Sequence, residues 1–208
     1  MIPVSLGLIK SLARPGGNIT GRANITDDLG PKRMELLHGM LPKVSRMAVL
    51  VDSSGAAQTH MGDNLQDAAQ KRRVTIVRVE AGSPQEIERA FATLAREKVG
   101  ALIVSFTPLF NQQKNQIAEL ATKYRLPTVA GDRFFAEAGC LMSYGASLTD
   151  DFHRLATYVD KIVKGAKPSD LPVEQATRFE LVINEKTASL LGLKVTPELL
   201  LQADKVIE

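Results

Sequence analysis

Short apolar runs alternate with segments of helical periodicity through most of the chain. The apolar or alternating runs predict strands over 46–51, 74–79, 101–106, 126–130 and 141–144. The segments between them predict helices over 56–72, 84–95, 110–124 and 149–164, the last of which ends at Gly165. A capping box formed by Ser83 and Glu86, with Pro84 between them, marks the start of the second helix.

The spacing of these strands indicates the fold class. Four strands recur every 25 to 28 residues with a helix between each pair, which is the pattern of βαβ units. Because crossovers between parallel strands are right-handed, the helices cover both faces of an open sheet. The sequence therefore predicts an α/β fold with a doubly wound parallel sheet.

The two ends of the chain fit this pattern less simply. Residues 4–13 predict an amphipathic helix, although no strand precedes it to receive its apolar face, and a strand-like segment follows at 18–21. The C-terminal part predicts, in order, an exposed connection at 167–172, a strand over 179–183, a short helix between Asn184 and Gly192, and a last helical turn at Pro197.

Composition narrows the class of protein. The chain has 208 residues, of which 44% are hydrophobic and 24% charged, as expected of a globular chain with a substantial core. It has no apolar run of roughly 18 residues for a transmembrane helix, and its N-terminus lacks the features of a secretory signal. The single cysteine, Cys140, excludes a disulfide framework and a thiolate-rich zinc site.

Charge and motifs argue against several partners and chemistries. The net charge of +3 arises from 26 basic and 23 acidic residues mixed along the sequence, so nucleic acid is not an expected partner. His38, His60 and His153 lack the spacing of metal ligands. The sequence has no phosphate-binding loop, dinucleotide fingerprint or nucleophile elbow. We therefore expect no metal, no cofactor and no catalytic activity.

Polar residues follow several of the predicted strands. In a parallel sheet, ligands bind beyond the carboxyl ends of the strands, near the point where strand order reverses. The residues at these ends that are candidates for contacting a small polar or zwitterionic ligand are Asp52, Ser53, Ser54, Thr107, Asp132 and Tyr144. The first three precede a predicted helix, whose free N–H groups suit a carboxylate.

Each candidate also has a structural interpretation. The three polar residues after the first strand are common helix caps. Asp132 and its neighbour Arg133 can form a surface ion pair, and Tyr144 can simply mark the end of a strand. The aromatic residues near these ends are more often part of a core than ligand contacts: Phe110, Phe134 and Phe135. The sequence leaves these alternatives open.

Several short motifs occur in order along the chain. They are SLARPGGNITG at 11–21, KRMELL at 32–37 with Leu41-Pro42 beyond it, LMSYG at 141–145, LPVEQ at 171–175, FELVIN at 179–184 and ADKVIE at 203–208. As an ordered set they resemble the ABC-transporter substrate-binding protein family that includes the TrpX-type tryptophan and tyrosine binders. The resemblance covers essentially the whole chain.

The resemblance implies a type I periplasmic-binding-protein fold, in which two α/β lobes joined by three crossovers capture a small ligand for delivery to a membrane permease. It implies an aromatic or branched amino acid, or a similar carboxylate, as the ligand. The implied segments are residues 1–25 as a remnant of the first lobe with the first crossover, 26–139 as the second lobe, 140–165 as the return to the first lobe, and 166–208 as the third crossover and C-terminal segment. Asp52, Ser53 and Ser54 match the ligand-facing loop after the first strand of the second lobe, Thr107 and Asp132 the next two loops, and Tyr144 the hinge.

The sequence also departs from the family pattern. The family ordinarily has a signal sequence and several βα units before the equivalent of Val4. Membership implies a periplasmic or extracytoplasmic location, whereas this chain shows no signal peptide. A chain without most of the first lobe is expected to bind its ligand weakly or not at all, and to self-associate through the face that the absent lobe leaves uncovered.

Two other functions stay open from the sequence. One is a ligand-sensing effector domain of a cytoplasmic regulator with the same two-lobed fold, although no helix-turn-helix with a basic recognition helix precedes the lobe. The other is a small enzyme that uses Asp52 or Asp132 as an acid or base.

Overall fold

The computed structural model describes residues 3–4, 6–23, 29–53 and 59–208, with the backbone alone for 59–64. The chain forms two compact units. The larger unit comprises Thr26–Gly145 and Glu180–Glu208, and the smaller unit comprises Met1–Ile25 and Ala146–Phe179.

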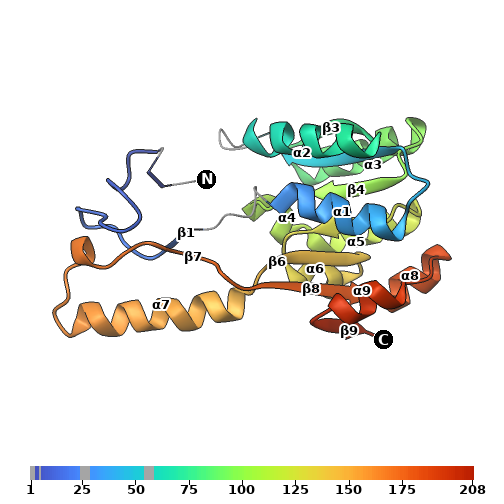
Figure 1. The fold of residues 1–208 in the computed structure, drawn as a ribbon. Coiled ribbons are helices and arrows are strands. Elements are labelled where there is room, and N and C mark those ends of the chain that lie inside the picture. The colour runs from blue at the N-terminus through green and yellow to red at the C-terminus, as the bar shows by residue number, and fades with distance from the viewer. Residues whose placement is uncertain (1–2, 5, 24–28, 54–58) are drawn as a thin grey trace. The chain divides into compact units, whose positions relative to one another are not determined.

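A seven-stranded sheet forms the centre of the larger unit (Figure 1). Its strands, in chain order, are β2 (Arg46–Asp52), β3 (Thr75–Ala81), β4 (Ala101–Val104), β5 (Thr128–Ala130), β6 (Met142–Ala146), β8 (Phe179–Asn184) and β9 (Lys205–Ile207). Their spatial order is β3-β2-β4-β5-β6-β8-β9. The first five are parallel, with Met47 paired with Ile76 and Ala101, and Val129 paired with Met142. The predicted doubly wound parallel sheet is therefore confirmed.

The last two strands, β8 and β9, lie beyond β6 in the sheet, and the chain runs through them in the direction opposite to β6. Asn184, the last residue of β8, donates its N–H to the carbonyl of Leu141, immediately before β6, at 2.9 Å. Because the end of β8 lies beside the start of β6, these neighbouring strands are antiparallel. β9 is parallel to β8.

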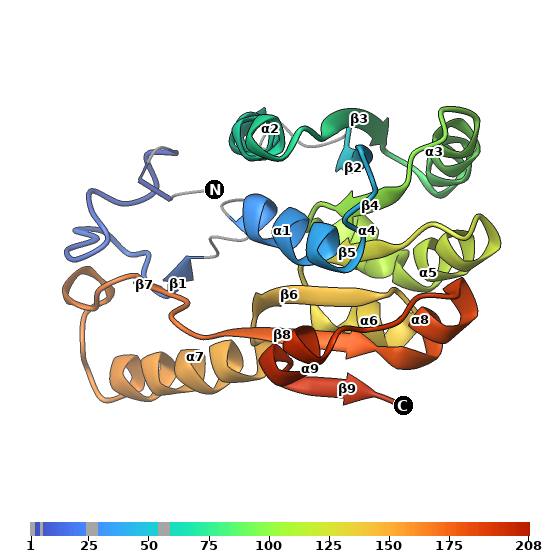
Figure 2. The same cartoon turned by 45° about the vertical axis from the view of Figure 1, so that its right-hand side comes forward.

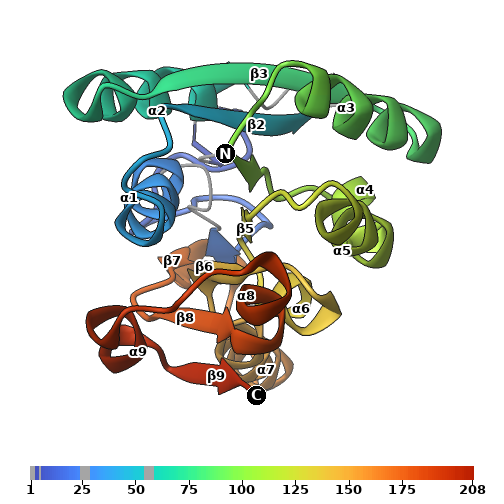
Figure 3. The same ribbon diagram turned by 90° about the vertical axis from the view of Figure 1, so that its right-hand side faces the viewer.

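Helices cover both faces of the sheet (Figures 2 and 3). They are α1 (Gly30–Met40), α2 (Thr59–Arg72), α3 (Pro84–Arg96), α4 (Pro108–Gln112), α5 (Lys114–Lys123), α6 (Arg133–Ala138), α8 (Glu185–Leu191) and α9 (Pro197–Gln202). One buried apolar core contains side chains of α1, α2 and α9, and a second contains side chains of α3, α5 and α6. Alternate residues of the central strands supply both, since Val49 belongs to the first core and Leu50 to the second.

The predicted capping box at the start of α3 is present. Ser83 Oγ accepts the Glu86 N–H at 3.3 Å, and the Glu86 carboxylate accepts the Gly82 N–H at 2.7 Å. The apolar side of this helix is buried, with Ile87 and Phe91 both inaccessible to solvent. Local sequence and tertiary packing therefore agree at this helix.

The segment predicted as one helix over 110–124 is two helices. Thr107 caps α4 ahead of Pro108, and the chain departs from helical geometry at Gln113 (φ −95°, ψ 16°) before α5 begins. The predicted helix over 56–72 is described from Thr59 onward, and its first three residues lie outside the described part of the chain.

The smaller unit contains one long helix and a short parallel strand pair. Its elements are β1 (Arg22–Ala23), α7 (Leu148–Val163), a 3-10 turn at Pro168–Asp170 and β7 (Glu174–Gln175). α7 confirms the predicted helix over 149–164, with Ser147 as its cap and Gly165 at φ +99° after it. β1 pairs with β7 through Arg22 opposite Glu174. The strand-like segment at 18–21 is not a strand, because β1 begins only at Arg22.

The predicted helix over 4–13 is wrong. The described residues of this segment form turns, and Gly7 adopts φ +69°, a left-handed conformation that interrupts a right-handed helix. Ile9 alone of its apolar residues is buried, against Ala23 and Val173. The helical spacing of apolar residues therefore predicted a helix where the chain forms turns, with Ile9 buried and several other apolar residues exposed. In the described residues, no helix combines the length and apolar character needed to cross a membrane.

Candidate functional site

Most of the predicted site residues lie at the carboxyl edge of the parallel strands in the larger unit. Asp52 ends β2, and Thr107 and Asp132 follow the adjacent strands β4 and β5. Tyr144 is the middle residue of β6 and comes directly after Ser143, which pairs with the last residue of β5. Because neighbouring parallel strands end on the same side of a sheet, the fold brings these four residues to one edge. Ser53 follows Asp52 there, and Ser54 lies outside the described residues.

The two described candidates at the end of β2 differ in exposure. Asp52 is 6% exposed, whereas Ser53 is exposed and donates its N–H to the Ala81 carbonyl at 3.3 Å. This hydrogen bond continues the β2–β3 ladder by one residue beyond the strands. Capping of a helix by these residues stays a prediction, because the chain between Ser53 and Thr59 lies outside the described part.

Thr107 has a clear structural role. Its Oγ1 accepts the Phe110 N–H at 3.2 Å and caps α4.

Phe110 is completely buried in the core beneath α3 and α5, and Phe135 is 1% exposed in the same core. The core interpretation of these two aromatic residues is therefore confirmed.

Asp132 combines a cap with an unpaired oxygen. Its Oδ1 accepts the Phe134 N–H at 2.8 Å and caps α6. The residue is only 2% exposed, and its buried Oδ2 has no hydrogen-bond partner in the described structure. Burial raises the pKa of this carboxyl above its ordinary value, while the hydrogen bond from Phe134 acts in the opposite direction.

The predicted ion pair between Asp132 and Arg133 is not found. The Arg133 guanidinium instead lies 3.9 Å from the Glu137 carboxylate and 5.4 Å from the centre of the Phe134 ring. The position of Arg133 on the first turn of α6 directs it along the helix toward the residue four positions later. The Arg133 charge still acts on Asp132 without an ion pair, because it opposes the rise in the pKa of that carboxyl.

Two buried serines at the same edge were not predicted as site residues. Ser105 directly follows β4 and is 3% exposed, and Ser143 lies in β6 and is 1% exposed. Neither Oγ has a hydrogen-bond partner in the part of the chain that the structure describes. The sequence signal for both was a polar residue near the end of an apolar run, which strand prediction alone treats as part of the strand.

Arg33 was also missed. This α1 residue is completely buried, and its Nε donates to the Tyr144 carbonyl at 2.9 Å. The hydrogen bond places this buried guanidinium beside Tyr144, the middle residue of β6. In the sequence Arg33 stood only within the KRMELL motif, where no helix was predicted, so no signal marked it as a buried residue.

Two glycines bring the loop after β5 against β6. A Cβ atom on Gly145 would lie 1.8 Å from the Gly131 carbonyl oxygen, so the two backbones approach more closely than any side chain would permit. Gly131 immediately precedes Asp132, and Gly145 immediately follows Tyr144. The close approach therefore fixes the spacing between these two candidate residues.

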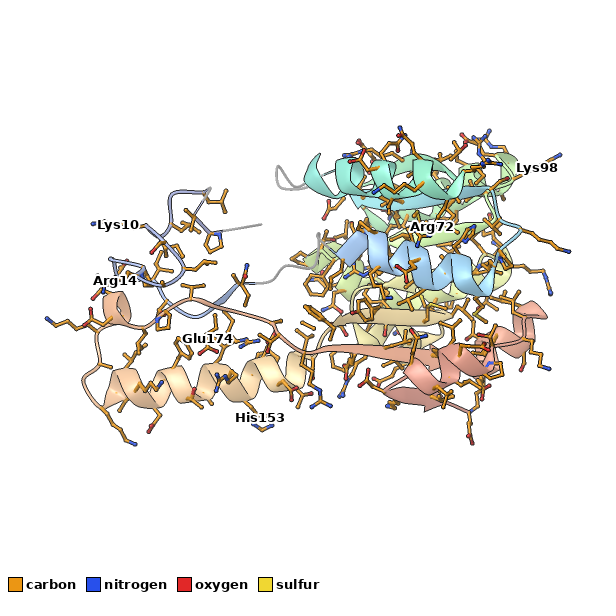
Figure 4. The ribbon with its side chains drawn as sticks, in the orientation of Figure 1. Lys10, Arg14, Arg72, Lys98, His153 and Glu174 are labelled. Atoms are coloured by element: carbon orange, nitrogen blue, oxygen red, sulfur yellow. The ribbon has the colours of Figure 1, made fainter. Side chains whose placement is uncertain are left out.

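The smaller unit contains a separate polar cavity of about 760 Å³ beside α7. Arg22 bridges Asp151 at 2.6 Å and Glu174 at 3.3 Å, and Arg154 reaches Glu174 at 3.1 Å. Figure 4 labels Glu174 beside this helix. The charges of these arginine and carboxylate side chains therefore compensate one another.

The described residues show no arrangement suited to metal binding. No grouping of three or more His, Cys, Asp or Glu side chains that could hold an ion occurs among them. Burial also raises the pKa of the Cys140 thiol to about 12, which keeps it protonated and unreactive at neutral pH.

A family model and a curated relative show which family the chain belongs to. A model of the ABC transporter substrate binding protein family matches residues 1–207. The curated tyrosine-binding protein of Clostridioides difficile (strain R20291) is 25% identical over 192 residues, which cover 92% of this chain and 55% of that protein. The chain thus spans about half the length of this curated relative.

Solved structures show the same fold. An ABC domain from Streptococcus pneumoniae in complex with L-Trp has a TM-score of 0.89 and 25% identity, covering 100% of this chain and 69% of that one. A ligand-free, open substrate binding protein with adhesive properties from Clostridium difficile has a TM-score of 0.71 and 24% identity, covering 99% and 68%. The type I periplasmic-binding-protein-like fold expected from the motifs is thus confirmed.

Proposed function

The chain belongs to the family of ABC transporter substrate-binding proteins, and from that membership we propose that it serves as the solute-binding component of an uptake transporter for an aromatic amino acid. The ligands in the names of its relatives, tyrosine and L-Trp, support this ligand class. A regulatory effector domain is less well supported. The family model describes substrate-binding proteins of ABC transporters, and the curated relative is a tyrosine-binding protein.

The observation that carries the proposal is the set of buried polar atoms without partners at the carboxyl edge. They are Ser105 Oγ, Asp132 Oδ2 and Ser143 Oγ. Buried polar groups in folded proteins are nearly always hydrogen-bonded, because leaving one unpaired costs about 1–3 kcal/mol. Three such atoms at one edge are therefore well suited to partners that a ligand brings.

The chemistry of these atoms matches an amino acid. The Asp132 carboxylate can accept hydrogen bonds from an α-ammonium group, which would lower the raised pKa of that carboxyl. The serine hydroxyls can donate hydrogen bonds to the carboxylate of the same amino acid. Neither reaction chemistry nor a cofactor is needed for this role, and we propose that the protein is not an enzyme.

The division into compact units supports the lobe assignment expected from the motifs. We propose that residues 1–25 end the first lobe and enter the first crossover, that 26–139 form the second lobe, that 140–165 return to the first lobe, and that 166–208 contain the third crossover and the C-terminal segment. The chain passes between its compact units after Ile25, Gly145 and Phe179, which is the number of passages that three crossovers require.

Location and partners follow from the same role. We propose that the protein acts outside the cytoplasm, as its family does, and delivers its ligand to a membrane permease. Self-association through an uncovered face stays a prediction, to be measured by the dependence of molecular mass on concentration.

Calorimetric titration with L-tyrosine and L-tryptophan tests the proposal. Asp132→Asn keeps an oxygen that can cap α6 but removes the negative charge, and we expect binding to weaken about 10- to 100-fold, because a hydrogen bond to a charged group contributes about 1.5–3 kcal/mol. The matched control is Asp204→Asn, since Asp204 also accepts a backbone N–H, from Leu181 at 2.8 Å, but precedes β9. The control should bind as the unsubstituted protein does.

Two results would contradict the proposal. Equal affinity of Asp132→Asn and the unsubstituted protein would remove Asp132 from the site. Binding of a different class of small molecule, such as a sugar, by the unsubstituted protein under conditions in which neither amino acid binds would overturn the proposed ligand class.

A further inference from the structure

The amino-terminal edge of the same parallel strands, opposite the candidate ligand site, brings four loops together. The Ser45 carbonyl accepts the Thr75 N–H at 2.8 Å, and the Arg46 carbonyl accepts the Gly100 N–H at 2.9 Å. Similarly, the carbonyl of Pro127 accepts the Leu102 N–H at 2.9 Å. The loops that enter β2, β3, β4 and β5 are therefore immediate neighbours, and Figure 3 views the larger unit from this side.

These four loops, with the helix and strand ends beside them, carry more positive charge than the net +3 of the whole chain. Segments 41–46, 71–75, 96–100 and 122–127 together contain nine basic residues and one acidic residue, Glu97. Of the 26 basic and 23 acidic residues of the whole chain, this leaves 17 basic and 22 acidic for the rest. Charges that are mixed along the sequence are thus separated in space. The excess of basic residues is limited to the part of this edge formed by β2, β3, β4 and β5. Toward β8 and β9 the acidic residues Glu137 and Glu185 occur.

We call five exposed residues of these loops and of the start of β2 the basic edge: Lys43, Arg46, Arg73, Lys98 and Arg125. Glu97 pairs with Arg46 at 2.6 Å, and Arg125 donates to the Leu191 carbonyl at 3.3 Å. Arg73 and Lys98 make no side-chain hydrogen bond or ion pair within the described residues. Figure 4 shows Lys98 pointing outward from the end of the larger unit.

Three residues of the basic edge adopt a left-handed backbone conformation that favours glycine. Arg73, Lys98 and Arg125 have φ of 56°, 53° and 50°, and they are the non-glycine residues with positive φ in the described structure. Glycine occupies such left-handed positions after helices without steric cost, whereas a residue with a Cβ does not. Favourable interaction of cations with helix C-termini is already provided by Arg72, Arg96 and Lys123 in the last turns. A basic residue at each strained position therefore suggests a second role.

We propose that the basic edge binds the anionic headgroups of a membrane surface. The four strands behind it span about 14 Å at the usual strand separation, so the charges form a broad face and not a narrow groove. Recognition of nucleic acid would require an element that enters a groove or aromatic rings on which bases stack. The aromatic residue of these loops, Tyr124, is half-buried and stacked on Phe91 at 6.2 Å. The inference rests on the proposed role of the protein beside a membrane permease, whichever amino acid it binds.

The test compares binding of the whole protein to vesicles of phosphatidylcholine with phosphatidylglycerol and to vesicles of phosphatidylcholine alone. We expect preferential binding to the anionic vesicles, and we expect it to be abolished at about 1 M salt, where the screening length falls to about 3 Å. In the triple variant Arg73→Gly, Lys98→Gly and Arg125→Gly, binding should weaken on the order of 100-fold, since each basic residue near an anionic bilayer contributes roughly fivefold. Its melting temperature should not fall, because glycine suits all three backbone positions.

The matched control removes three positive charges of the smaller unit, in Lys10→Gln, Arg14→Gln and Lys167→Gln, and all three residues are exposed. It should retain most of the vesicle binding. An equal loss in both variants, or no preference of the unsubstituted protein for anionic vesicles, would overturn the proposal. Binding of duplex DNA without binding of vesicles would likewise assign the basic edge to a different partner. Amino-acid binding measured on the same variants should be unchanged, so failure here is distinguishable from failure of the proposed ligand site.

Discussion

Substitution of Gly145 by alanine provides a sensitive test of the close approach between β6 and the loop after β5. The new Cβ would lie 1.8 Å from the Gly131 carbonyl oxygen, whereas carbon and oxygen atoms approach favourably to about 3.3 Å. The two backbones would have to separate by about 1.5 Å. Overpacking of this kind costs about 1–3 kcal/mol and sometimes more, and the lower unfolded-state entropy of alanine offsets only about 0.5–1 kcal/mol.

We therefore expect Gly145→Ala to lower the free energy of unfolding by about 2 kcal/mol, because the opposing atom is backbone and cannot rotate away. At about 2–4 °C per kcal/mol for a chain of this size, the melting temperature should fall by about 4–8 °C. Circular dichroism during thermal and urea unfolding measures both quantities. Gly39→Ala is the control, because a Cβ there meets nothing within 4 Å, and it should stabilise α1 by up to about 1 kcal/mol. A Gly145→Ala protein within about 0.5 kcal/mol of the unsubstituted protein would refute the close approach.

Three further substitutions test the capping box and the unpaired polar atoms. Ser83→Ala removes the cap of α3 and should cost about 1 kcal/mol in chemical unfolding, and an unchanged midpoint would contradict the observed capping box. Ser143→Ala should leave the stability of the ligand-free protein unchanged or slightly raised, because the hydroxyl has no partner, while it weakens amino-acid binding; marked destabilisation would show that the hydroxyl is paired. Asp132 has a pKa raised by burial, so the folded protein binds a proton more tightly than the unfolded chain, and its ionisation lowers stability as pH rises through the interval between the two pKa values. Asp132→Asn should therefore be more stable than the unsubstituted protein at neutral pH, with an advantage that disappears as pH falls below the unfolded-state pKa near 3.9, and an advantage that persists there would contradict the assignment.

The sequence was most informative where local and tertiary preferences coincide. The five parallel strands and α3 were predictable because apolar runs, turn residues and the Ser83–Glu86 box all favour the same elements. The segment at 4–13 was not, since helical spacing of apolar residues says nothing of whether a surface exists to bury them. The reversal of β8 was equally hidden, because a single strand has the same sequence pattern in either direction.

The candidate site was predictable in position but not in detail. The topology rule located Asp52, Thr107, Asp132 and Tyr144 at one edge from the ends of strands alone. Burial and hydrogen-bond satisfaction, which mark Ser105 and Ser143, depend on neighbours that are distant in sequence. The basic edge escaped sequence analysis for the same reason, because its charges come from four separate loops that only the sheet brings together.

Titration of the isotope-labelled protein with L-tyrosine and L-tryptophan, followed by two-dimensional NMR, tests the central claim most directly. We predict that the largest changes in amide shift occur at Ser105, Asp132 and the segment 143–145, with little change at Arg73, Lys98 and Arg125 on the opposite edge. Saturable changes confined to the carboxyl edge would support an amino-acid site there. Changes centred on any other surface, with the carboxyl edge unaffected, would contradict it.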